Sequence, residues 1–308
     1  MRKPFRAGGV AVGALAVALT AGAFAFAPAS SAVTTVTGSK VPASIRPSTP
    51  LTAVGAGPGA AARAATSVTS LQSVNWAGYA ASFGTTTFRF VSAHFTVPPL
   101  DCTGVTAANG AWSAHWVGLD GFRSTSTTVE QTGLLAGCDG TTPEYAPFWE
   151  MFPNAPGYPS ITVNPGDTIS VSVYYNRSTR KFSLTFSDTT NGQSFTRTRA
   201  CPAGATCRRN SAEAISEAPF DATTSSVLPL ADFGTASFTS ASITNTSGTH
   251  RGGLQSSFWN SYQITQAAGS GTNFTITGDA IPEGTVLDTP SALSQKVSFT
   301  DQWATANG

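Results

Sequence analysis

The chain has 308 residues, of which 17 are Lys or Arg and 16 are Asp or Glu, and its net charge is +1. Charged residues make up 11% of it, against ~25% in an average globular protein. After the N-terminus no basic cluster exceeds Arg208-Arg209, which argues against a nucleic-acid partner. A surface this poor in carboxylates suits an acidic medium.

The first residues have the pattern of a secretory signal peptide. Arg2, Lys3 and Arg6 precede an apolar run over residues 10–26, and small residues follow up to residue 32. The same run is long enough to anchor a membrane protein, but basic residues flank only its N-terminal side. We therefore expect cleavage of residues 1–32 and a secreted, extracellular protein. No later stretch reaches the ~20 apolar residues of a spanning helix, so we expect no membrane contact after processing.

Residues 33–68 form a second compositional unit, with four prolines and no aromatic or acidic residue. Such a segment cannot bury enough apolar surface to fold alone, so composition favours a linker or disordered tail. Charge favours a propeptide. Lys40, Arg46 and Arg63 lie here, whereas all 16 acidic residues lie from Asp101 onward, and the chain beyond this unit carries 11 − 16 = −5. We hypothesise that the basic segment pairs with an acidic cleft and holds it shut.

Residues 69–308 are expected to form a single β-sandwich domain. Apolar and polar residues alternate with period two, and Gly and Pro interrupt the alternation at short intervals. This pattern predicts an all-β antiparallel sandwich. The strands we expect are 88–91, 94–97, 115–119, 127–132, 161–163, 169–175, 182–186, 195–199, 236–244, 257–265, 273–277 and 296–300.

Four cysteines lie in the exported part of the chain, so disulfides are expected. Three pairings are possible. We favour Cys102 with Cys138 and Cys201 with Cys207, because the second pair closes a short Pro-Ala-Gly-Ala-Thr loop. Metal binding is the competing interpretation, but no Cys-x-x-Cys spacing or nearby histidine supports it, and we expect no metal.

The common nucleophile motifs of hydrolases are missing from the sequence: it has no GxSxG, no HExxH and no cysteine beside a candidate base. The three histidines, His94, His115 and His250, belong to no recognisable triad. His115 lies in an apolar strand beside Trp116, where a packed core histidine is the simpler interpretation. Carboxylates are therefore the remaining candidates for general acid or base catalysis.

Four segments, taken in chain order, resemble the glutamic peptidases (eqolisins, peptidase family G1, formerly grouped as A4). The resemblance covers about Ser73 to Phe238. The segments are Asn75-Trp76-Ala77-Gly78-Tyr79, the pair Trp116-Val117-Gly118-Leu119-Asp120-Gly121 and Val129-Glu130-Gln131-Thr132-Gly133, Phe148-Trp149-Glu150-Met151-Phe152-Pro153, and Asn210 to Glu217 with its Ala-Glu-x-x-x-Glu pattern.

This resemblance implies a sandwich of two large antiparallel sheets, in the manner of a concanavalin- or lectin-like jelly roll. It also implies a catalytic pair, Gln131 and Glu217. Substrate-binding or cleft residues would be Trp116, Asp120, Glu150, Phe148, Trp76 and Glu213. Ala214 stands where the family usually has an aromatic residue, and Phe148 and Met151 replace bulkier aromatics, which leaves the shape of the subsites open.

The chemistry agrees with this pair. Amide hydrolysis needs a base for water, an acid for the leaving nitrogen and a donor for the oxyanion. Glu217 can supply the first two functions and the Gln131 carboxamide the third. If residues 213–217 are extended, Glu213 and Glu217 share one face. The sequence thus predicts a monomeric, acid-active endopeptidase that acts on polypeptides without a cofactor.

Two other interpretations remain. A sandwich glycosidase would use two carboxylates roughly 5–10 Å apart, for example Glu150 and Glu217, and would not need Gln131. A non-catalytic carbohydrate-binding module would turn over no polymer, and the fold alone does not exclude it. Without the family resemblance, Glu217 would be a solvated strand carboxylate, Asp120 a turn-former and Trp76 a core residue.

Overall fold

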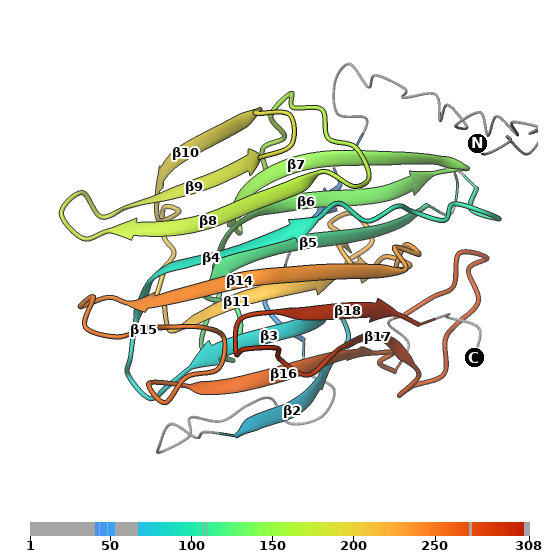
Figure 1. The fold of residues 1–308 in the computed structure, drawn as a ribbon. Coiled ribbons are helices and arrows are strands. Elements are labelled where there is room, and N and C mark those ends of the chain that lie inside the picture. Colours follow the sequence, from blue (N-terminus) through green and yellow to red (C-terminus); the bar gives the residue numbers. More distant parts are fainter. Residues whose placement is uncertain are drawn as a thin grey trace, which may run out of the picture. The chain divides into compact units, whose positions relative to one another are not determined.

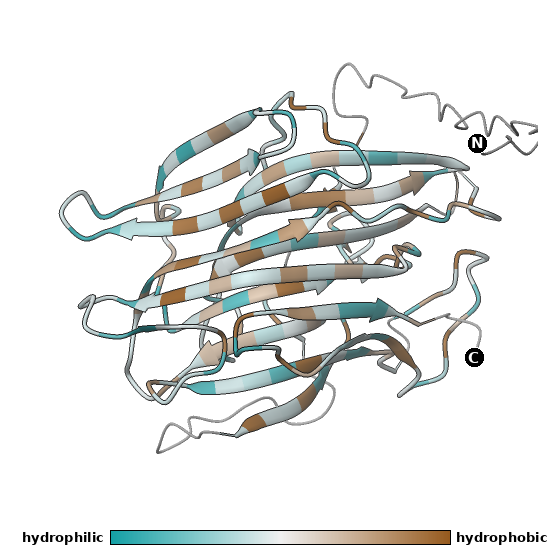
Figure 2. Ribbon diagram, viewed as in Figure 1, coloured by the Kyte–Doolittle hydropathy of each residue, from teal (hydrophilic) through white to brown (hydrophobic). Residues whose placement is uncertain are grey.

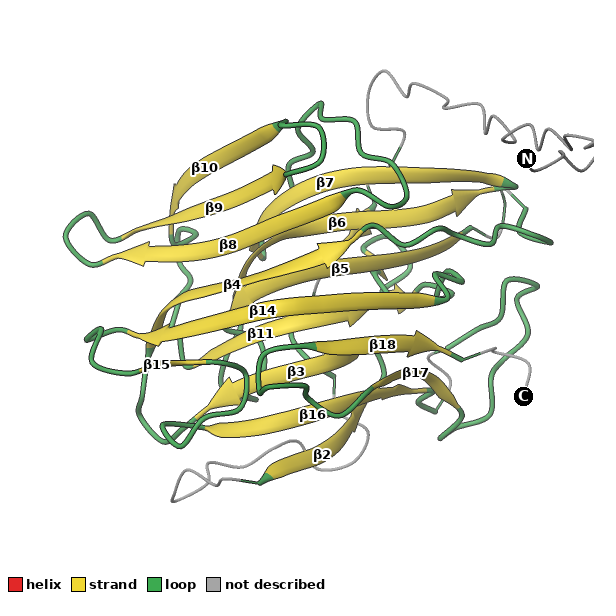
Figure 3. Cartoon of the chain, in the orientation of Figure 1, coloured by secondary structure: helices red, strands yellow, loops and turns green. Residues whose placement is uncertain are grey.

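The structure is a computed structural model that describes residues 41, 42, 44–47, 49–52, 67–106, 108, 110–270 and 273–304. The predicted signal peptide lies outside them. The described residues form strands and loops, and no helix occurs among them (Figure 3). This part of the chain thus has no helix that is long and apolar enough to span a bilayer.

The strands are β1 (Ile45–Arg46), β2 (Val68–Ser73), β3 (Trp76–Ser82), β4 (Phe88–Thr96), β5 (Ala111–Leu119), β6 (Val129–Asp139), β7 (Thr142–Phe152), β8 (Thr168–Asn176), β9 (Lys181–Asp188), β10 (Ser194–Ala200), β11 (Ser211–Glu217), β12 (Phe220–Asp221), β13 (Ser226–Val227), β14 (Thr235–Asn245), β15 (Arg251–Gly252), β16 (Asn260–Ala267), β17 (Val286–Pro290) and β18 (Phe299–Trp303).

One 15-stranded sheet folds over into two layers (Figure 1). The first layer has the order β10-β9-β8-β4-β14 and the second has the order β16-β3-β11-β5-β6-β7, while β18 and β17 link them. Strand β4 contacts β5 and β11 of the opposite layer, and β6 contacts β8 and β9. Nearly all neighbours pair antiparallel; β2 pairs parallel with β16. The predicted all-β antiparallel sandwich is confirmed.

The main core lies between the layers and follows from the period-two alternation. In β9, Phe182, Leu184 and Phe186 are buried, whereas the polar residues between them are partly exposed. Figure 2 shows the same alternation of hydrophobic and hydrophilic residues along the strands. Each such aromatic or aliphatic side chain stabilises the fold by about 1.5–3 kcal/mol when it leaves water.

The other face of the second layer carries a second apolar cluster. It contains Trp76, Trp116, Phe148 and Ile215, all fully buried. The segment of residues 41–52, called here the leader segment, covers this face. Its Ile45 is 3% exposed within the cluster, and Val41 and Leu51 pack against it. Strand β1 of this segment pairs with β12, and β13 completes a three-stranded sheet.

Two predicted strands are wrong. Residues 161–163 are a loop between Pro159 and Pro165, and the Thr162 carbonyl accepts hydrogen bonds from the side chains of Asn191 and Gln193 rather than from a neighbouring strand. Proline cannot donate to a ladder, so this stretch cannot join the sheet.

The predicted strand 273–277 is also a loop, because its backbone closes on itself. Thr275 donates to the carbonyl of Asp279, and Gly278 donates back to Thr275.

Both predicted disulfides are confirmed. Cys102 and Cys138 have Cα atoms 5.5 Å apart, and Cys201 and Cys207 have Cα atoms 5.9 Å apart.

Candidate active site

The proposed pair, Gln131 and Glu217, stands on one face of the second layer. Gln131 of β6 lies opposite Gly118 of β5, and Glu217 of β11 lies opposite Ala114 of the same strand. Positions 114 and 118 share a face because side chains alternate along a strand. The two residues are thus two strands and four register positions apart, on the face that carries the second apolar cluster.

Two neutral donors hold the carboxylate of Glu217. The Nδ2 atom of Asn75 donates to its Oε1 atom at 3.2 Å, and the indole Nε1 of Trp116 donates to its Oε2 atom at 2.9 Å. Hydrogen bonds of this kind favour the ionised form of a buried carboxyl group. Each carboxylate oxygen of Glu217 thus has one hydrogen-bond donor.

Gln131 is oriented by Glu150. The amide Nε2 of Gln131 donates to Oε2 of Glu150 at 2.8 Å, and the two residues are direct neighbours on β6 and β7. An ionised carboxylate only accepts hydrogen bonds, so it fixes which end of the amide faces it. The amide oxygen of Gln131 is buried and has no hydrogen-bond partner among the described residues.

Trp116 spans the interval between the two candidates. Its Nε1 touches Glu217, and its benzo ring covers Gly118, where an added Cβ atom would lie 2.8 Å from Cζ3 of the indole and 3.3 Å from the Cβ of Gln131. An added Cβ at Gly133 would lie 2.6 Å from the Cβ of Trp116. Gly118 is therefore explained by the space that this indole needs, whereas Gly133 lies against backbone, since an added Cβ there would also lie 2.1 Å from the carbonyl oxygen of His115.

The other predicted wall residues lie on the same face. The ring of Trp76 meets that of Trp116 edge-on, with 5.0 Å between centroids. Phe148 of β7 is opposite Gly133 and fully buried. These aromatic groups can provide the apolar sides of a cleft.

Asp120 and Glu213 belong to a buried group of carboxyls that also contains Glu130. Asp120 accepts hydrogen bonds from the main-chain N–H groups of Arg209, at 2.6 Å, and Asn210, at 2.9 Å. It thereby holds the loop that enters β11. Burial and then the charge of Asp120 raise the pKa of Glu130; burial also raises that of Glu213, with a smaller contribution from Asp120.

Directly behind Glu217, a polar chain runs through the core between the layers. Ser216 donates from Oγ to Oδ2 of Asp301 at 2.7 Å, and its Oγ lies 3.0 Å from Nδ1 of His115. Burial lowers the pKa of His115 to about 3, so the ring is neutral. The prediction that His115 is a packed core residue is confirmed.

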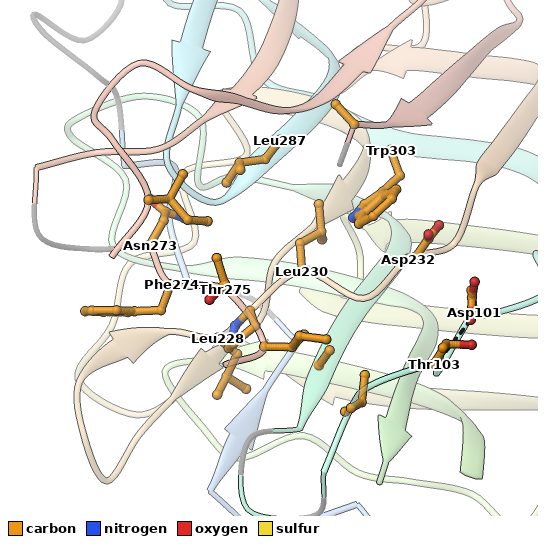
Figure 4. Close-up of a pocket in the computed structure, with 16 residues that line it drawn as sticks. Asp101, Thr103, Leu228, Leu230, Asp232, Asn273, Phe274, Thr275, Leu287 and Trp303 are labelled. Atoms are coloured by element: carbon orange, nitrogen blue, oxygen red, sulfur yellow. Dashed lines mark hydrogen bonds between the residues drawn. The ribbon is translucent and has the colours of Figure 1, made fainter. Parts of the chain in front are cut away.

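All three polar residues of the site are closed off from solvent. Gln131, Glu150 and Glu217 are each 0% exposed. A cavity of about 220 Å³ lies elsewhere, lined by apolar side chains such as Leu230, with Asp101 and Asp232 at one side (Figure 4). None of the predicted site residues lines it, which is expected because the leader segment covers the candidate site.

Sequence reasoning missed Asn75 as a functional residue. The segment Asn75-Trp76 carries the family resemblance, and its tryptophan is the predicted wall residue because aromatic side chains commonly line clefts. A polar residue at a strand start is a weak signal by itself, and only the structure shows its contact with Glu217.

Among the described residues, no group of three or more His, Cys, Asp or Glu side chains is placed to hold a metal ion.

The glycosidase alternative finds no support in this arrangement. Glu150 lies one strand farther from Glu217 than Gln131 does, and its carboxylate is turned to the Gln131 amide. A pair that cleaves a glycosidic bond must instead face that bond from two sides.

Comparison with known proteins identifies a family and a relative. The model of the Peptidase A4 family matches residues 74–282. Aspergillopepsin-2 of Aspergillus niger is 34% identical over 191 residues, which is 56% of this chain and 65% of that protein, slightly less than two thirds of its length.

Solved structures agree on the fold. Scytalido-glutamic peptidase with a transition state analog inhibitor superposes with a TM-score of 0.58 at 24% identity, over 75% of this chain and 98% of the other. SCP-B, a member of the eqolisin family in complex with the tripeptide Ala-Ile-His, gives 0.51 at 22% identity over the same shares.

Proposed function

Because the chain belongs to the Peptidase A4 family, we propose that it is a secreted, acid-active glutamic endopeptidase whose catalytic pair is Glu217 and Gln131. One observation carries the proposal. The carboxylate and the carboxamide stand on one face of one sheet, and each is oriented by its own partners, Asn75 and Trp116 for Glu217 and Glu150 for Gln131.

The reaction begins with ionised Glu217. Its carboxylate takes a proton from a water molecule, whose oxygen adds to the carbonyl carbon of the substrate. The protonated Glu217 then gives the proton to the leaving nitrogen, and the C–N bond breaks. One carboxyl group thus serves as base and acid in turn, and atoms balance without a covalent intermediate.

Gln131 stabilises the charge that develops on the carbonyl oxygen. One N–H of its amide is held by Glu150, so the second N–H is pre-oriented before the substrate arrives. A donor aimed at this oxygen is worth ~3 kcal/mol in comparable sites, or ~100-fold in rate. In this account Glu150 is a positioning residue and makes no contact with the reacting atoms.

Acid activity is supported by the charge state of the rest of the protein. Glu130, Glu213, Asp288 and Asp301 are buried carboxyls whose pKa values are raised by burial, so acidic conditions keep them neutral and the fold intact. The apolar N-terminal run and the two disulfides support export. In this proposal residues 1–32 are removed during export, and the released enzyme is a monomer that cleaves polypeptides.

Digestion of a denatured protein between about pH 2 and 7 tests the proposal. We expect cleavage by the acid-incubated chain, and a loss of at least ~100-fold in Gln131→Ala and Glu217→Gln. A pepsin-type inhibitor and a chelator should have no effect, because the chemistry uses neither two aspartates nor a metal.

Two matched variants control this assay. Gln193→Ala and Glu283→Gln change the same residue types at exposed loop positions and should cleave like the parent. Thermal unfolding must show that all variants are folded. Full activity in either Gln131→Ala or Glu217→Gln, or cleavage of a polysaccharide instead of a protein, would rule the proposal out.

A further inference from the structure

Separate parts of the chain line the cavity shown in Figure 4. The loop before β14 contributes Leu230, the loop after β16 contributes Ile276, and β17 and β18 contribute Leu287 and Trp303. An engineered apolar cavity of ~150 Å³ binds benzene. The cavity of about 220 Å³ therefore has room for a benzene ring with a short chain attached.

Two carboxylates stand opposite each other at the rim of this cavity. Asp101 and Asp232 form an antiparallel bridge, in which the N–H of Asp101 donates to the carbonyl of Asp232 at 2.9 Å. Side chains that are paired in this way lie about 5 Å apart on the same face, and like charges in that position destabilise a fold. The two aspartates therefore cost stability unless a cation neutralises them.

Main-chain donors fix both carboxylates at the rim. The N–H of Thr103 donates to Oδ1 of Asp101 at 2.9 Å, and the N–H of Gly234 donates to Oδ1 of Asp232 at 2.9 Å. Hydrogen bonds from Thr103 lower the pKa of Asp101, which favours its ionised form. Burial raises the pKa of Asp232, and the charge of Asp101 adds to that rise, although the hydrogen bond from Gly234 opposes it. Asp232 thus responds to the negative charge of Asp101.

The rim suits a positive group that comes from outside the protein. Among the described residues, no lysine or arginine is one of the groups that shift the pKa of Asp101 or Asp232. Trp303 lies beside the same turn, because its N–H donates to the carbonyl of Gly234 at 2.9 Å, and its indole lines the cavity. The face of an indole attracts cations, as the two carboxylates do.

We propose that the cavity binds a small arylalkylammonium ion, with its aromatic ring against Leu230, Ile276 and Leu287 and its ammonium group between Asp101 and Asp232. Burial of the ring stabilises the complex, and the ammonium group removes the repulsion between the carboxylates. This ligand chemistry occurs in free amines and at the N-terminus of a peptide that begins with an aromatic residue. The inference goes beyond the proposed peptidase function, because neither proposed catalytic residue lines the cavity.

Calorimetric titration of the full chain with phenethylamine tests the inference at about pH 6, which lies above the ordinary pKa of an aspartate. We expect saturable binding with a Kd of about 1 mM or tighter. The matched ligand 2-phenylethanol has the same ring and chain but a neutral hydroxyl in place of the ammonium group. It should bind about tenfold more weakly, because it leaves the two carboxylates without a cation. Equal affinity for the two ligands, or no saturable binding of phenethylamine up to ~10 mM, would overturn the inference.

The variant Asp232→Asn separates a binding role from a structural one. Asparagine still accepts the hydrogen bond from Gly234 but carries no charge. Phenethylamine should bind this variant about tenfold more weakly. Its melting temperature without ligand should equal or exceed that of the parent, because the repulsion by Asp101 is gone. Asp139→Asn removes the same charge at the exposed end of β6 and should change neither quantity. Unchanged phenethylamine affinity in folded Asp232→Asn would contradict the proposal.

A second variant, Ile276→Trp, keeps the test decisive if Asp232→Asn does not fold. Ile276 lies in a loop and is only partly buried, so a larger side chain can enter the cavity without displacing a strand. It should weaken the binding of phenethylamine and of 2-phenylethanol alike, by about tenfold or more, because it takes the space of the ring. Unchanged binding of both ligands would place the ring elsewhere and refute the inference.

A tripeptide distinguishes the two sources of the ligand. Phe-Ala-Ala with an amidated C-terminus carries an ammonium group and a ring at nearly the same spacing as phenethylamine. Tighter binding of the tripeptide than of phenethylamine assigns the site to peptide N-termini, and weaker binding assigns it to free amines. Either result supports the site only if Asp232→Asn weakens the binding of the preferred ligand, and the site fails if it does not.

Discussion

At the residue scale, the polar groups of the site are arranged as donor and acceptor pairs with little freedom. Glu217 has a donor on each oxygen, and the Gln131 amide has its orientation set by Glu150. Trp116 contributes one of those donors, and its indole covers Gly118. The recognised sequence motifs therefore reflect one packed unit in which the glycines are as necessary as the polar residues.

The hydrogen bond from Asn75 to Glu217 should influence how kcat/KM depends on pH. Asn75→Ala removes one of the two donors that favour the ionised form of Glu217. The acid limb of kcat/KM against pH should therefore move to higher pH, by up to about one unit for a hydrogen bond worth ~1 kcal/mol. The measurement is made on acid-activated protein, with Asn154→Ala at an exposed position as the control. An unchanged acid limb would show that Asn75 does not influence Glu217.

At the scale of elements, β17 and β18 bring two carboxyls into the core. Burial raises the pKa of Asp301 to about 7, and burial and then Asp301 raise that of Asp288. Both pKa values are raised from the ordinary 3.8, so the protonated forms favour the folded state. The contribution of Asp301 to stability is present below about pH 4 and is lost as the pH rises through about 7.

Asp301→Asn should remove much of this loss. Asparagine can still accept the hydrogen bond from Ser216 but carries no charge. In the parent, the free energy of unfolding should fall by up to ~1.4 kcal/mol per pH unit over this range. We therefore expect the melting temperature of Asp301→Asn to fall less between about pH 4 and 8 than that of the parent. Asp139→Asn, at the exposed end of β6, is the control. A parent protein that is as stable at pH 8 as at pH 4 would contradict this account.

Several elements could be predicted from the sequence, and the exceptions have physical reasons. Alternation in β8, β9 and β14 identified strands that bury one face. The sequence does not predict strand β7, because Pro143 and Pro147 interrupt its pattern. The strand tolerates them because it is the edge strand of the sheet, with β6 as its neighbouring strand and a single further bridge from Trp149 to Gly157. The last predicted strand begins three residues later than expected because Gln295 and Lys296 adopt positive φ angles in a turn.

The candidate site was predicted in part. The two catalytic candidates and the three aromatic wall residues lie on one face, as the alternation and the family resemblance implied. The seat of the leader segment was not predictable in detail, because main-chain hydrogen bonds such as those of Thr52 leave no residue pattern.

At the scale of the whole molecule, the two disulfides constrain the unfolded chain to different degrees. Cys102 and Cys138 are 36 residues apart, whereas Cys201 and Cys207 are 6 apart. By loop entropy, replacing the first pair with serines should cost about 4 kcal/mol of unfolding free energy and the second about 2 kcal/mol. Denaturant unfolding of the two double variants measures this. Equal losses, or a larger loss for the shorter loop, would contradict the entropic explanation.

In the proposed mechanism, the Glu217 carboxyl and the Gln131 carboxamide act on the same water and carbonyl. A double-mutant cycle tests it most directly: kcat/KM of acid-activated parent, Gln131→Ala, Glu217→Gln and the double variant, measured with one peptide at one acidic pH. We predict that the double variant loses little more activity than Glu217→Gln alone, because groups that act as a unit are strongly non-additive. Losses that simply multiply would contradict the account.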